Sequence, residues 1–458
     1  MSTYKRILTA ALAVAIGMEG VRAAGAQQPP AQTPSSKTIT FSDAIRIALE
    51  QNTAIRQAKN TAALNSAAVT QQKLAFLPNL SLSANTAQDY GRNFNQSEGR
   101  IVDQTTNSMN AGLSSSVTLF DGLKNVASLK SAKLDEQAGE QDLTRAKQTV
   151  VFTVASNFLS LVSQQEQLRV QQENLTAQET LEKQIDQFVK AGSRPVSDLY
   201  QQQATVASAR AAVVTTRNAV ELAKVDLIQT LQLDPRGTYD FRAPSVGSTV
   251  PADPHFNLDS LLDRAFAQRA DLDAQESRVD AAKQDVKAAS ASKWPSISLS
   301  AGYNSGVSSA SDASFLDQLN QRRGGSIGIG VSIPLFDRGN TQVATERAQI
   351  QAENARLALA SQRQQVALEV RRAYLDYQAS REQFAAAEAQ QRAAELAVST
   401  TQQRYQVGAA TLVELSLARA TQVQAASALV NARYNLVFQQ ALMSYYTGEL
   451  DPQHVTLG

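Results

Sequence analysis

The sequence predicts a mainly α-helical chain that is built from two copies of one unit and that also carries four membrane β-strands. Three observations support this fold class. Residues 340–407 contain neither Gly nor Pro, sequence landmarks recur about 217 positions apart, and four short segments alternate apolar with small polar residues. At about 1.5 Å per residue, a helix over 340–407 would be roughly 100 Å long.

The long helix carries a heptad pattern along its length. Large apolar residues recur every seven positions, which indicates a coiled-coil seam whose register changes between segments. The residues of this seam are Val343, Ile350, Leu357, Val370, Tyr377, Phe384, Val398 and Tyr405.

Residues 1–26 have the pattern of a secretory signal peptide. Lys5 and Arg6 precede an apolar run that ends at Met18, and Ala24-Gly25-Ala26 resembles a cleavage site. Removing this segment changes the balance of basic and acidic residues from 43 and 42 to 40 and 41. A net charge close to zero argues against a nucleic-acid partner.

The composition limits other readings. The chain has 0 Cys, which excludes disulfides, thiol chemistry and a cysteine for lipid attachment after the signal peptide. It has only 21 Gly and 12 Pro in 458 residues, a composition that favours long helices over several compact domains. Beyond the signal peptide no apolar run is long enough for a transmembrane helix.

The internal duplication follows from landmarks that keep their order. Residues 78–83 recur 217 positions later as 295–300, Leu119-Phe120-Asp121 recurs as Leu335-Phe336-Asp337, and Gly192 recurs as Gly408. We therefore expect repeats over 41–235 and 258–452. A proline-rich linker over 236–257 joins them, and a flexible segment (27–40) and a short tail (453–458) flank them.

Each repeat is expected to run helix, strand, loop, strand, long helix, turn and helix. The first helix is expected from Phe41 to Leu74, with Ser42 as its N-cap. The other elements of the first repeat are strands over 79–90 and 109–120 and helices over 123–190 and 196–231. The second repeat has a helix, strands over 295–304 and 325–336, and helices over 340–407 and 412–447.

The four strands have the length and pattern of membrane strands. One face of each is aliphatic and the other is made of Ser, Gly and Asn, which suits lipid on one side and water on the other. Four strands cannot close a barrel, so subunits must share one. Two chains would give eight strands and a filled interior, whereas three would give twelve and a channel, and the small inner residues favour three.

The order of elements places all the helices on one side of the membrane, which is the periplasm for an exported protein. Phe120, Trp294 and Phe336 fall at the strand ends nearest the helices, where a belt of aromatic residues would lie. Ordinary packing at a corner between helix and strand is the alternative reading of these three residues.

The chain resembles the TolC-like outer-membrane efflux protein family, also called outer membrane factors, over about residues 38–452. The resemblance is carried by Val331-Ser332-Ile333-Pro334-Leu335-Phe336-Asp337 before the long helix and by Arg404-Tyr405-Gln406-Val407-Gly408 with Glu414-Leu415 at the turn. Asn431-Ala432-Arg433-Tyr434-Asn435 resembles the family's run in the last helix.

This resemblance implies a homotrimer with a twelve-stranded barrel in the outer membrane of a Gram-negative-type cell and a periplasmic barrel of coiled-coil helices. It implies passive conduction of drugs or secreted proteins, as in tripartite efflux or type I secretion. The implied partners are outer-membrane lipid, a periplasmic adaptor and an inner-membrane pump of the RND, ABC or MFS type. The adaptor would dock at the two turns, near Gly192, Arg194, Gly408 and Thr411.

The turns also carry the candidate gate. Asp198 and Glu414 each lie six residues after their turn glycine, and three chains would bring six carboxylates together. Arg404 and Tyr405 are candidates for tying closed hairpins together. The alternatives are acids favoured by the helix dipole, a solvated Arg and a seam Tyr. The family has a second acidic residue where this chain has Leu417.

No cofactor, metal site or catalytic group is indicated. The two histidines, His255 and His454, stand in no recognisable ligand or triad spacing, so we expect no enzyme activity. A periplasmic coiled-coil adaptor or scaffold is the alternative from another class. It would need only one hairpin flanked by compact sheet domains and would lack two strand pairs of membrane length.

Overall fold

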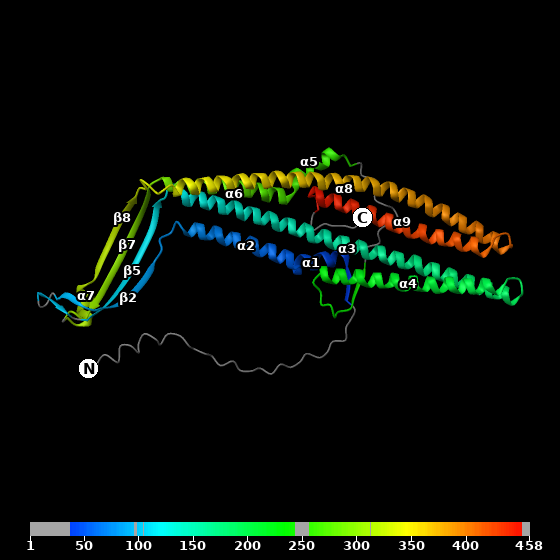
Figure 1. The fold of residues 1–458 in the computed structure, drawn as a ribbon, viewed down its shortest axis with the longest axis horizontal. Coiled ribbons are helices and arrows are strands. Elements are labelled where there is room, and N and C mark those ends of the chain that lie inside the picture. Colours follow the sequence, from blue (N-terminus) through cyan, green and yellow to red (C-terminus); the bar gives the residue numbers. More distant parts are fainter. Residues whose placement is uncertain (1–36, 96–98, 104, 243–255, 312, 451–458) are drawn as a thin grey trace, which may run out of the picture.

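The computed structural model describes residues 37–95, 99–103, 105–242, 256–311 and 313–450. The predicted signal peptide, most of the linker, the tail over 453–458, and His255 and His454 lie outside them. The described chain is a rod of helices with a curved sheet at one end (Figure 1). Two helices run through the rod, α3 (Lys124–Lys190) and α8 (Asn340–Gln406), each of 67 residues and therefore about 100 Å long.

Four shorter helices complete the rod in two rows. Helices α6 (Ala270–Ser290) and α9 (Leu412–Thr447) lie one after the other between α3 and α8 (Figure 1). Helices α2 (Thr53–Leu74) and α4 (Val196–Thr230) lie one after the other along the other side of α3. The described chain is thus a wall four helices wide, with α8 at one edge and α2 and α4 at the other.

The four predicted membrane strands form one antiparallel sheet in the order β2-β5-β7-β8. Their bounds are Ser81–Asp89 for β2, Thr106–Phe120 for β5, Ser296–Ser308 for β7 and Gly324–Ser332 for β8. The sheet's edges are β2, next to α2, and β8, next to α8. The two edges of the sheet therefore lie on the same sides of the molecule as the two edges of the helical wall.

The register confirms the predicted separation of the two faces. Leu82 pairs with Leu113 and Leu113 with Tyr303, whereas Ser81 pairs with Ser114 and Ser114 with Gly302. Directly paired residues share a face, so aliphatic side chains gather on one side and Ser and Gly on the other. The large residues of the aliphatic face are exposed in the single chain, as Leu82 is to 78%.

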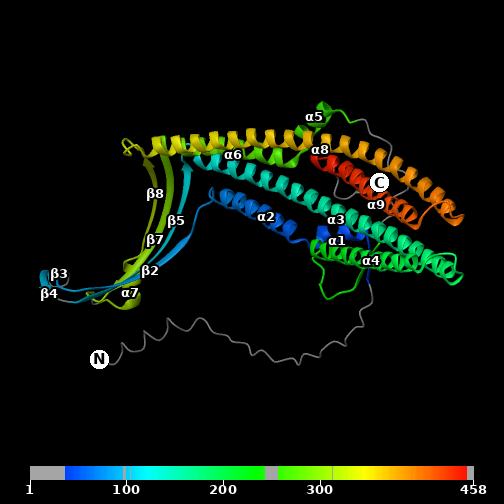
Figure 2. The same cartoon turned by 45° about the vertical axis from the view of Figure 1, so that its right-hand side comes forward.

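The far end of the sheet holds elements that the sequence reasoning missed. Where a polar loop was expected after the first strand, β3 (Arg92–Asn95) and β4 (Arg100–Asp103) form a hairpin. The second loop contains a short helix, α7 (Phe315–Gln321) (Figure 2). Both elements lie at the end of the sheet away from the helices.

Two details around the first helix correct the sequence predictions. Lys37–Thr40 form β1, which pairs in parallel with β6 (Tyr239–Arg242), so the segment over 27–40 is not flexible throughout. Thr40, and not Ser42, caps α1 (Phe41–Gln51) through a capping box with Asp43. The expected single helix over 41–74 is also divided, because it breaks at Asn52 into α1 and α2.

The predicted seam of α8 is buried within the chain along only part of its length. Val370, Tyr377, Val398 and Tyr405 are buried as expected, whereas Val343, Ile350 and Leu357 are exposed. These three residues lie on the outer edge of the wall, where the single chain offers them no partner. In the described part of the chain, no helix has both the length and the apolar character needed to span a bilayer.

Two short helices must meet end to end inside the wall, and each meeting point leaves unpaired helix-terminal groups. In the row of α2 and α4, Asn52 supplies the partners. Its amide nitrogen donates to the carbonyl of Thr230 at the end of α4, 3.0 Å away, and its amide oxygen caps α2 by accepting from the Ala54 N–H. Asn157 on α3 donates to the Thr230 hydroxyl at 2.7 Å. This junction is neutral.

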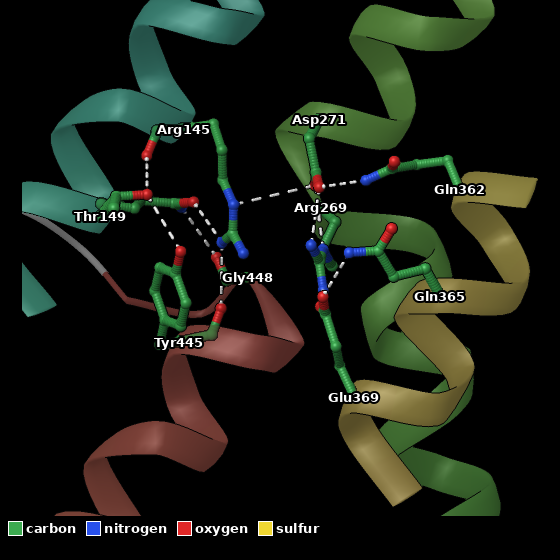
Figure 3. Close-up of polar contacts among 10 residues, drawn as sticks. Arg145, Thr149, Arg269, Asp271, Gln362, Gln365, Glu369, Tyr445 and Gly448 are labelled. Atoms are coloured by element: carbon green, nitrogen blue, oxygen red, sulfur yellow. Dashed lines mark hydrogen bonds and ion pairs between the residues drawn. The ribbon is translucent and has the colours of Figure 1, made fainter. Parts of the chain in front are cut away.

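The junction between α6 and α9 is equivalent, but charged residues form it. Arg269 stands there, 217 residues after Asn52. After α5 (Leu258–Gln268) and its break, Arg269 leads into α6, and Gly448 follows α9 with a left-handed φ of +82°. A Cβ on Gly448 would lie 2.8 Å from the Gln268 carbonyl oxygen, so the two ends touch. Arg145 on α3 donates to the carbonyl of Tyr445 at 3.1 Å (Figure 3).

The charges of this junction form one network between α3, α6 and α8 (Figure 3). Arg269, only 3% exposed, binds Asp271 through two hydrogen bonds of 2.9 and 2.6 Å and Glu369 on α8 at 2.7 Å. Arg145 lies 3.9 Å from Asp271. Burial alone would raise the pKa of Asp271, but the hydrogen bonds and charge of Arg269, with the charge of Arg145, lower that pKa overall.

We predict that Asp271→Asn lowers the free energy of unfolding by about 2–4 kcal/mol at neutral pH, because it leaves Arg269 and Arg145 buried with one carboxylate fewer. A carboxyl whose pKa is lowered on folding stabilises the protein above its unfolded pKa, and the contribution is lost as pH falls through the folded pKa. Below pH 4 the difference between wild type and variant should therefore shrink. Chemical unfolding at several pH values measures it.

Asp273→Asn is the control. Burial raises the pKa of Asp273, so this change should remove a destabilising contribution at neutral pH. Equal loss of stability in the two variants would contradict the network's role.

Candidate functional site

The free end of the wall is formed by two helical turns, one from each repeat. At the first, Gly192 follows α3 with φ of +71°, its N–H bonds the Val189 carbonyl, and the Ser193 N–H bonds the Phe188 carbonyl. This left-handed glycine closes the helix in the usual manner of a C-terminal cap. Pro195 then precedes α4 and fixes the chain direction into that helix.

The second turn repeats this design with a stronger start to its following helix. Gly408 has φ of +78°, and Arg404 donates to the Ala409 carbonyl at 3.0 Å within the same turn. Thr411 and Glu414 form a capping box, in which each side chain binds the other residue's N–H at 2.9 and 3.2 Å. The carboxylate of Glu414 is therefore already used by its own helix.

The two turns are joined through Tyr405. Its ring is 3% exposed and lies in an apolar cluster with side chains from both hairpins, listed as Leu181, Ile185, Ala410, Leu412 and Leu415. The guanidinium of Arg194, from the first turn, stands 4.7 Å from the ring centroid and also donates to the Tyr405 carbonyl at 3.3 Å. Arg194 and Tyr405 therefore hold the two hairpins together.

The hydroxyl of Tyr405 is buried and, among the described residues, has no hydrogen-bond partner. Burial raises the pKa of this hydroxyl; the charge of Arg194 acts in the opposite direction, and the charge of Asp198 acts in the same direction as burial. Asp198 thus lies close enough to be felt electrostatically at the joint.

Of the predicted gate residues, Tyr405 lies at the joint between the two turns with Asp198 near it, whereas Arg404 bonds the Ala409 carbonyl of its own turn and Glu414 caps α9. Arg194, which was predicted as part of a docking turn, also lies at this joint and bonds the Tyr405 carbonyl. That Arg404 and Tyr405 tie closed hairpins together stays a prediction. The contact of Arg194 with Tyr405 was missed, because no sequence spacing relates residues of the two repeats.

Sequence reasoning also missed Arg419, which lies on α9 two turns beyond the joint. This side chain is 9% exposed and donates to Gln402 at 3.2 Å, while its Nε and Nη1 atoms have no partner among the described residues. Burial lowers the pKa of Arg419.

At the opposite end of the wall, the three predicted interface aromatics lie where strands meet helices. Trp294 lies two residues before β7 and packs on Gly122, where a Cβ would lie 2.8 Å from that of Trp294. Phe120 ends β5, and Phe336 lies between β8 and α8 with 85% of its surface exposed. Their role at a membrane surface stays a prediction.

Two long edges, a sheet with one aliphatic face and a pair of turns define a channel-forming type of fold. The chain belongs to the outer membrane efflux protein family, whose model matches residues 44–231 and 261–449. The two matched segments coincide with the two repeats. This family consists of channels and not of enzymes, and its proteins lie in the outer membrane with a large periplasmic helical part.

Known relatives and solved structures agree with this assignment. The chain is 25% identical over 393 residues to outer membrane protein TolC of Vibrio cholerae, covering 85% of this chain and 86% of that protein. It is 27% identical to the pyoverdine export outer membrane protein OpmQ of Pseudomonas aeruginosa over 54% of this chain and 50% of OpmQ, and so spans about half the length of that relative.

The crystal structure of the outer membrane protein VceC from Vibrio cholerae has the same fold. It superposes with a TM-score of 0.76 at 20% identity, over 89% of this chain and 96% of that one. At that identity the likeness shows the fold alone.

We predict that Arg194→Gln loosens the joint between the two turns, since it removes the cation–π contact and the charge of the hydrogen-bond donor. The chain has 0 Cys, so cysteines introduced at the exposed Ala191 and Ala409, beside the two turn glycines, take spin labels specifically. Distance distributions between these labels should broaden in the variant. Arg404→Gln, which disturbs one turn only, is the control and should leave the distribution near that of the wild type. Equal broadening in both variants would contradict the joint.

Proposed function

We propose that three copies of this chain form an exit duct, with a shared barrel of twelve strands and a periplasmic tunnel of helices. The observation that carries this proposal is the coincidence of unpaired edges. In the described chain β2 and β8 each pair on one side only, and both edges of the helical wall expose apolar side chains. Joining β8 and α8 of one copy to β2, α2 and α4 of the next satisfies both edges.

The exposed side chains on the wall's edges form stripes. On α8 they recur at spacings of seven, eleven and twenty-one (three heptads), which keep them on one side of a helix. The members on α8 are Val343, Ile350, Leu357, Leu368, Leu375 and Leu396, and those on α4 include Tyr200, Val214, Leu222 and Val225. Apolar stripes of this length on opposite edges support assembly into a closed ring.

The faces of the sheet support a barrel with lipid outside and water inside. Aliphatic residues would contact lipid and the Ser and Gly face would line the channel, while Phe120, Trp294 and Phe336 would mark the inner boundary of the bilayer. Substrates would pass by diffusion, and the energy would come from an inner-membrane pump of the RND, ABC or MFS type.

The turns at the free end support contact with a periplasmic adaptor. A helical hairpin of the adaptor would reach the grooves between the helices at this tip. The residues of this chain that lie there are Gly192, Arg194, Gly408 and Thr411. A periplasmic adaptor or scaffold remains the second candidate from the sequence, but a four-stranded membrane-length sheet continuous with two hairpins favours the duct.

We further propose that Asp198, Glu414 and the joint of Arg194 with Tyr405 form the gate at the tip, with Arg404 stabilising the second turn. Opening would separate the two hairpins and break the contact of Arg194 with Tyr405. Six carboxylates near the axis would then favour cations over anions at the entrance.

Trimer formation is tested by placing charge on the α8 stripe. Leu357→Glu with Leu368→Glu should abolish the trimer, because each of three interfaces would bury unpaired carboxylates. Native mass measurement in detergent gives the assembly directly. Gln351→Glu with Ala358→Glu adds the same charge at two exposed positions about 100° around the helix from the stripe and should leave the trimer intact. A wild-type chain that stays monomeric and needs no detergent would overturn the duct.

The gate is tested by current through single trimers in a planar bilayer. Asp198→Asn with Glu414→Gln should move the ratio of cation to anion permeability towards one, since Gln can still serve in the capping box while the charge is gone. Glu346→Gln with Glu382→Gln removes as many charges from the body of α8 and should change the ratio little. An unchanged ratio in the first variant would exclude these carboxylates from the gate.

A further inference from the structure

The aliphatic face of the sheet carries a hollow that conduction through the duct does not use. It has a volume of about 590 Å³, within the range of ligand pockets. Two rows of paired residues line it: Leu113, Tyr303 and Gly325 in one, and Ser115, Ala301 and Ile327 in the next. Small side chains between large ones create the depression, and all six share one face of the sheet.

Helix α7 is fastened on this same face, next to the hollow. Ser305 lies two residues beyond Tyr303 and so shares its face, and its hydroxyl donates to the Leu319 carbonyl at 2.6 Å. Gln318 is buried, and its side-chain oxygen accepts from the Ser308 N–H at 2.7 Å. Figures 1 and 2 both place α7 at the end of the sheet away from the helices.

The exposed side of α7 is apolar, and the two residues that follow the helix are basic. Phe315 and Leu316 are 56% and 75% exposed, although they belong to a helix of only seven residues. The chain then passes through Arg322 and Arg323, both exposed and without an ion pair among the described residues, and enters β8 one residue before Gly325. Two exposed arginines therefore lie two and three residues before Gly325, which lines the hollow.

The depth of these groups follows from the strand. A tilted strand of about nine to eleven residues crosses the hydrocarbon of a bilayer. Strand β7 begins at Ser296, two residues after Trp294, and reaches Ser305 nine residues later. If Trp294 marks the inner boundary, Ser305, α7 and the two arginines lie at the depth of the lipid headgroups of the outer leaflet.

We propose that the hollow and the Arg322–Arg323 pair bind one phosphorylated glycolipid of the outer leaflet. An acyl chain occupies the hollow, and a phosphate group receives hydrogen bonds from the guanidinium groups, whose fork matches phosphate oxygens. Phe315 and Leu316 extend the apolar contact into the surrounding lipid. This inference rests on the proposed barrel, because only that arrangement turns the aliphatic face towards lipid.

The full-length chain in detergent is titrated with lipid A that carries two phosphates, and bound lipid is counted by native mass spectrometry. At about 1 kcal/mol for each arginine, Arg322→Gln with Arg323→Gln should weaken binding about thirtyfold. Arg371→Gln with Arg372→Gln removes an adjacent, exposed arginine pair from α8 and should leave the affinity within twofold. Ala301→Leu, which fills the hollow without changing charge, should also weaken binding.

Three results would overturn the site: equal affinity in wild type and Arg322→Gln with Arg323→Gln, an equal loss in the α8 control, or equal binding of dephosphorylated lipid A by the wild type. Competition by inorganic phosphate at the lipid's own concentration would reduce the site to a simple anion site and also contradict the proposal. The mass of the lipid-free protein separates these outcomes from a failure of the duct, since a trimer that ignores lipid A leaves the proposed function standing.

Discussion

The structure depends on one constraint: two pairs of shorter helices must meet end to end inside a wall that is one helix thick. A helix end leaves N–H and C=O groups without partners. Helices α1 and α5 pack beside the two junctions. Asn52, which follows α1, bonds the ends of α4 and α2, and Arg145 and Gln148 on α3 bond the last carbonyls of α9. Because α3 runs past both junctions without interruption, it aligns the shorter helices along its length.

The two repeats solve this constraint with different chemistry. Asn52 and Asn157 complete the first junction with neutral amides, whereas Arg145, Arg269, Asp271 and Glu369 complete the second with buried charges. The charged junction also joins the repeats, since Arg145 belongs to the first and its partners to the second. A buried ion pair gains little stability over an apolar one, but separating its members is costly, so this junction fixes the relative position of α3, α6 and α8.

Sequence reasoning located the large elements because they have strong periodic signals. The ends of α3, α4, α8 and α9 fall within one residue of the predicted bounds, since glycine and proline mark them. It failed where tertiary contacts decide the outcome. The break at Asn52 appears in no hydrophobic pattern, because it depends on the hydrogen bond from Asn52 to the end of α4. The short helix α7 likewise depends on the tertiary hydrogen bonds of Ser305 and Gln318.

The candidate site was predictable to a similar degree. Gly192, Gly408 and Thr411 lie where the pattern of turns put them, because left-handed glycines and N-caps are local features. The partner of Tyr405 was not, because Arg194 comes from the other repeat, 211 residues away. The exposure of Val343, Ile350 and Leu357 shows the same limit: a heptad pattern indicates that a stripe needs a partner, but not whether the partner is the same chain.

The two ends of α9 are held by different kinds of contact, which bears on the proposed opening of the tip. Near Gly448, Arg145 and Gln148 on α3 donate hydrogen bonds to the last carbonyls of α9. The charged network of Arg145 with Arg269, Asp271 and Glu369 adds to this attachment. At the tip, the hairpins share the apolar cluster around Tyr405, and Arg194 adds one cation–π contact worth about 1–2 kcal/mol and one hydrogen bond worth about 1 kcal/mol. In the proposed trimer, the contacts of three such arginines amount to about 6–9 kcal/mol, and separating the apolar clusters would add to this. An adaptor would need a difference in affinity between open and closed tips of at least this size to shift the population.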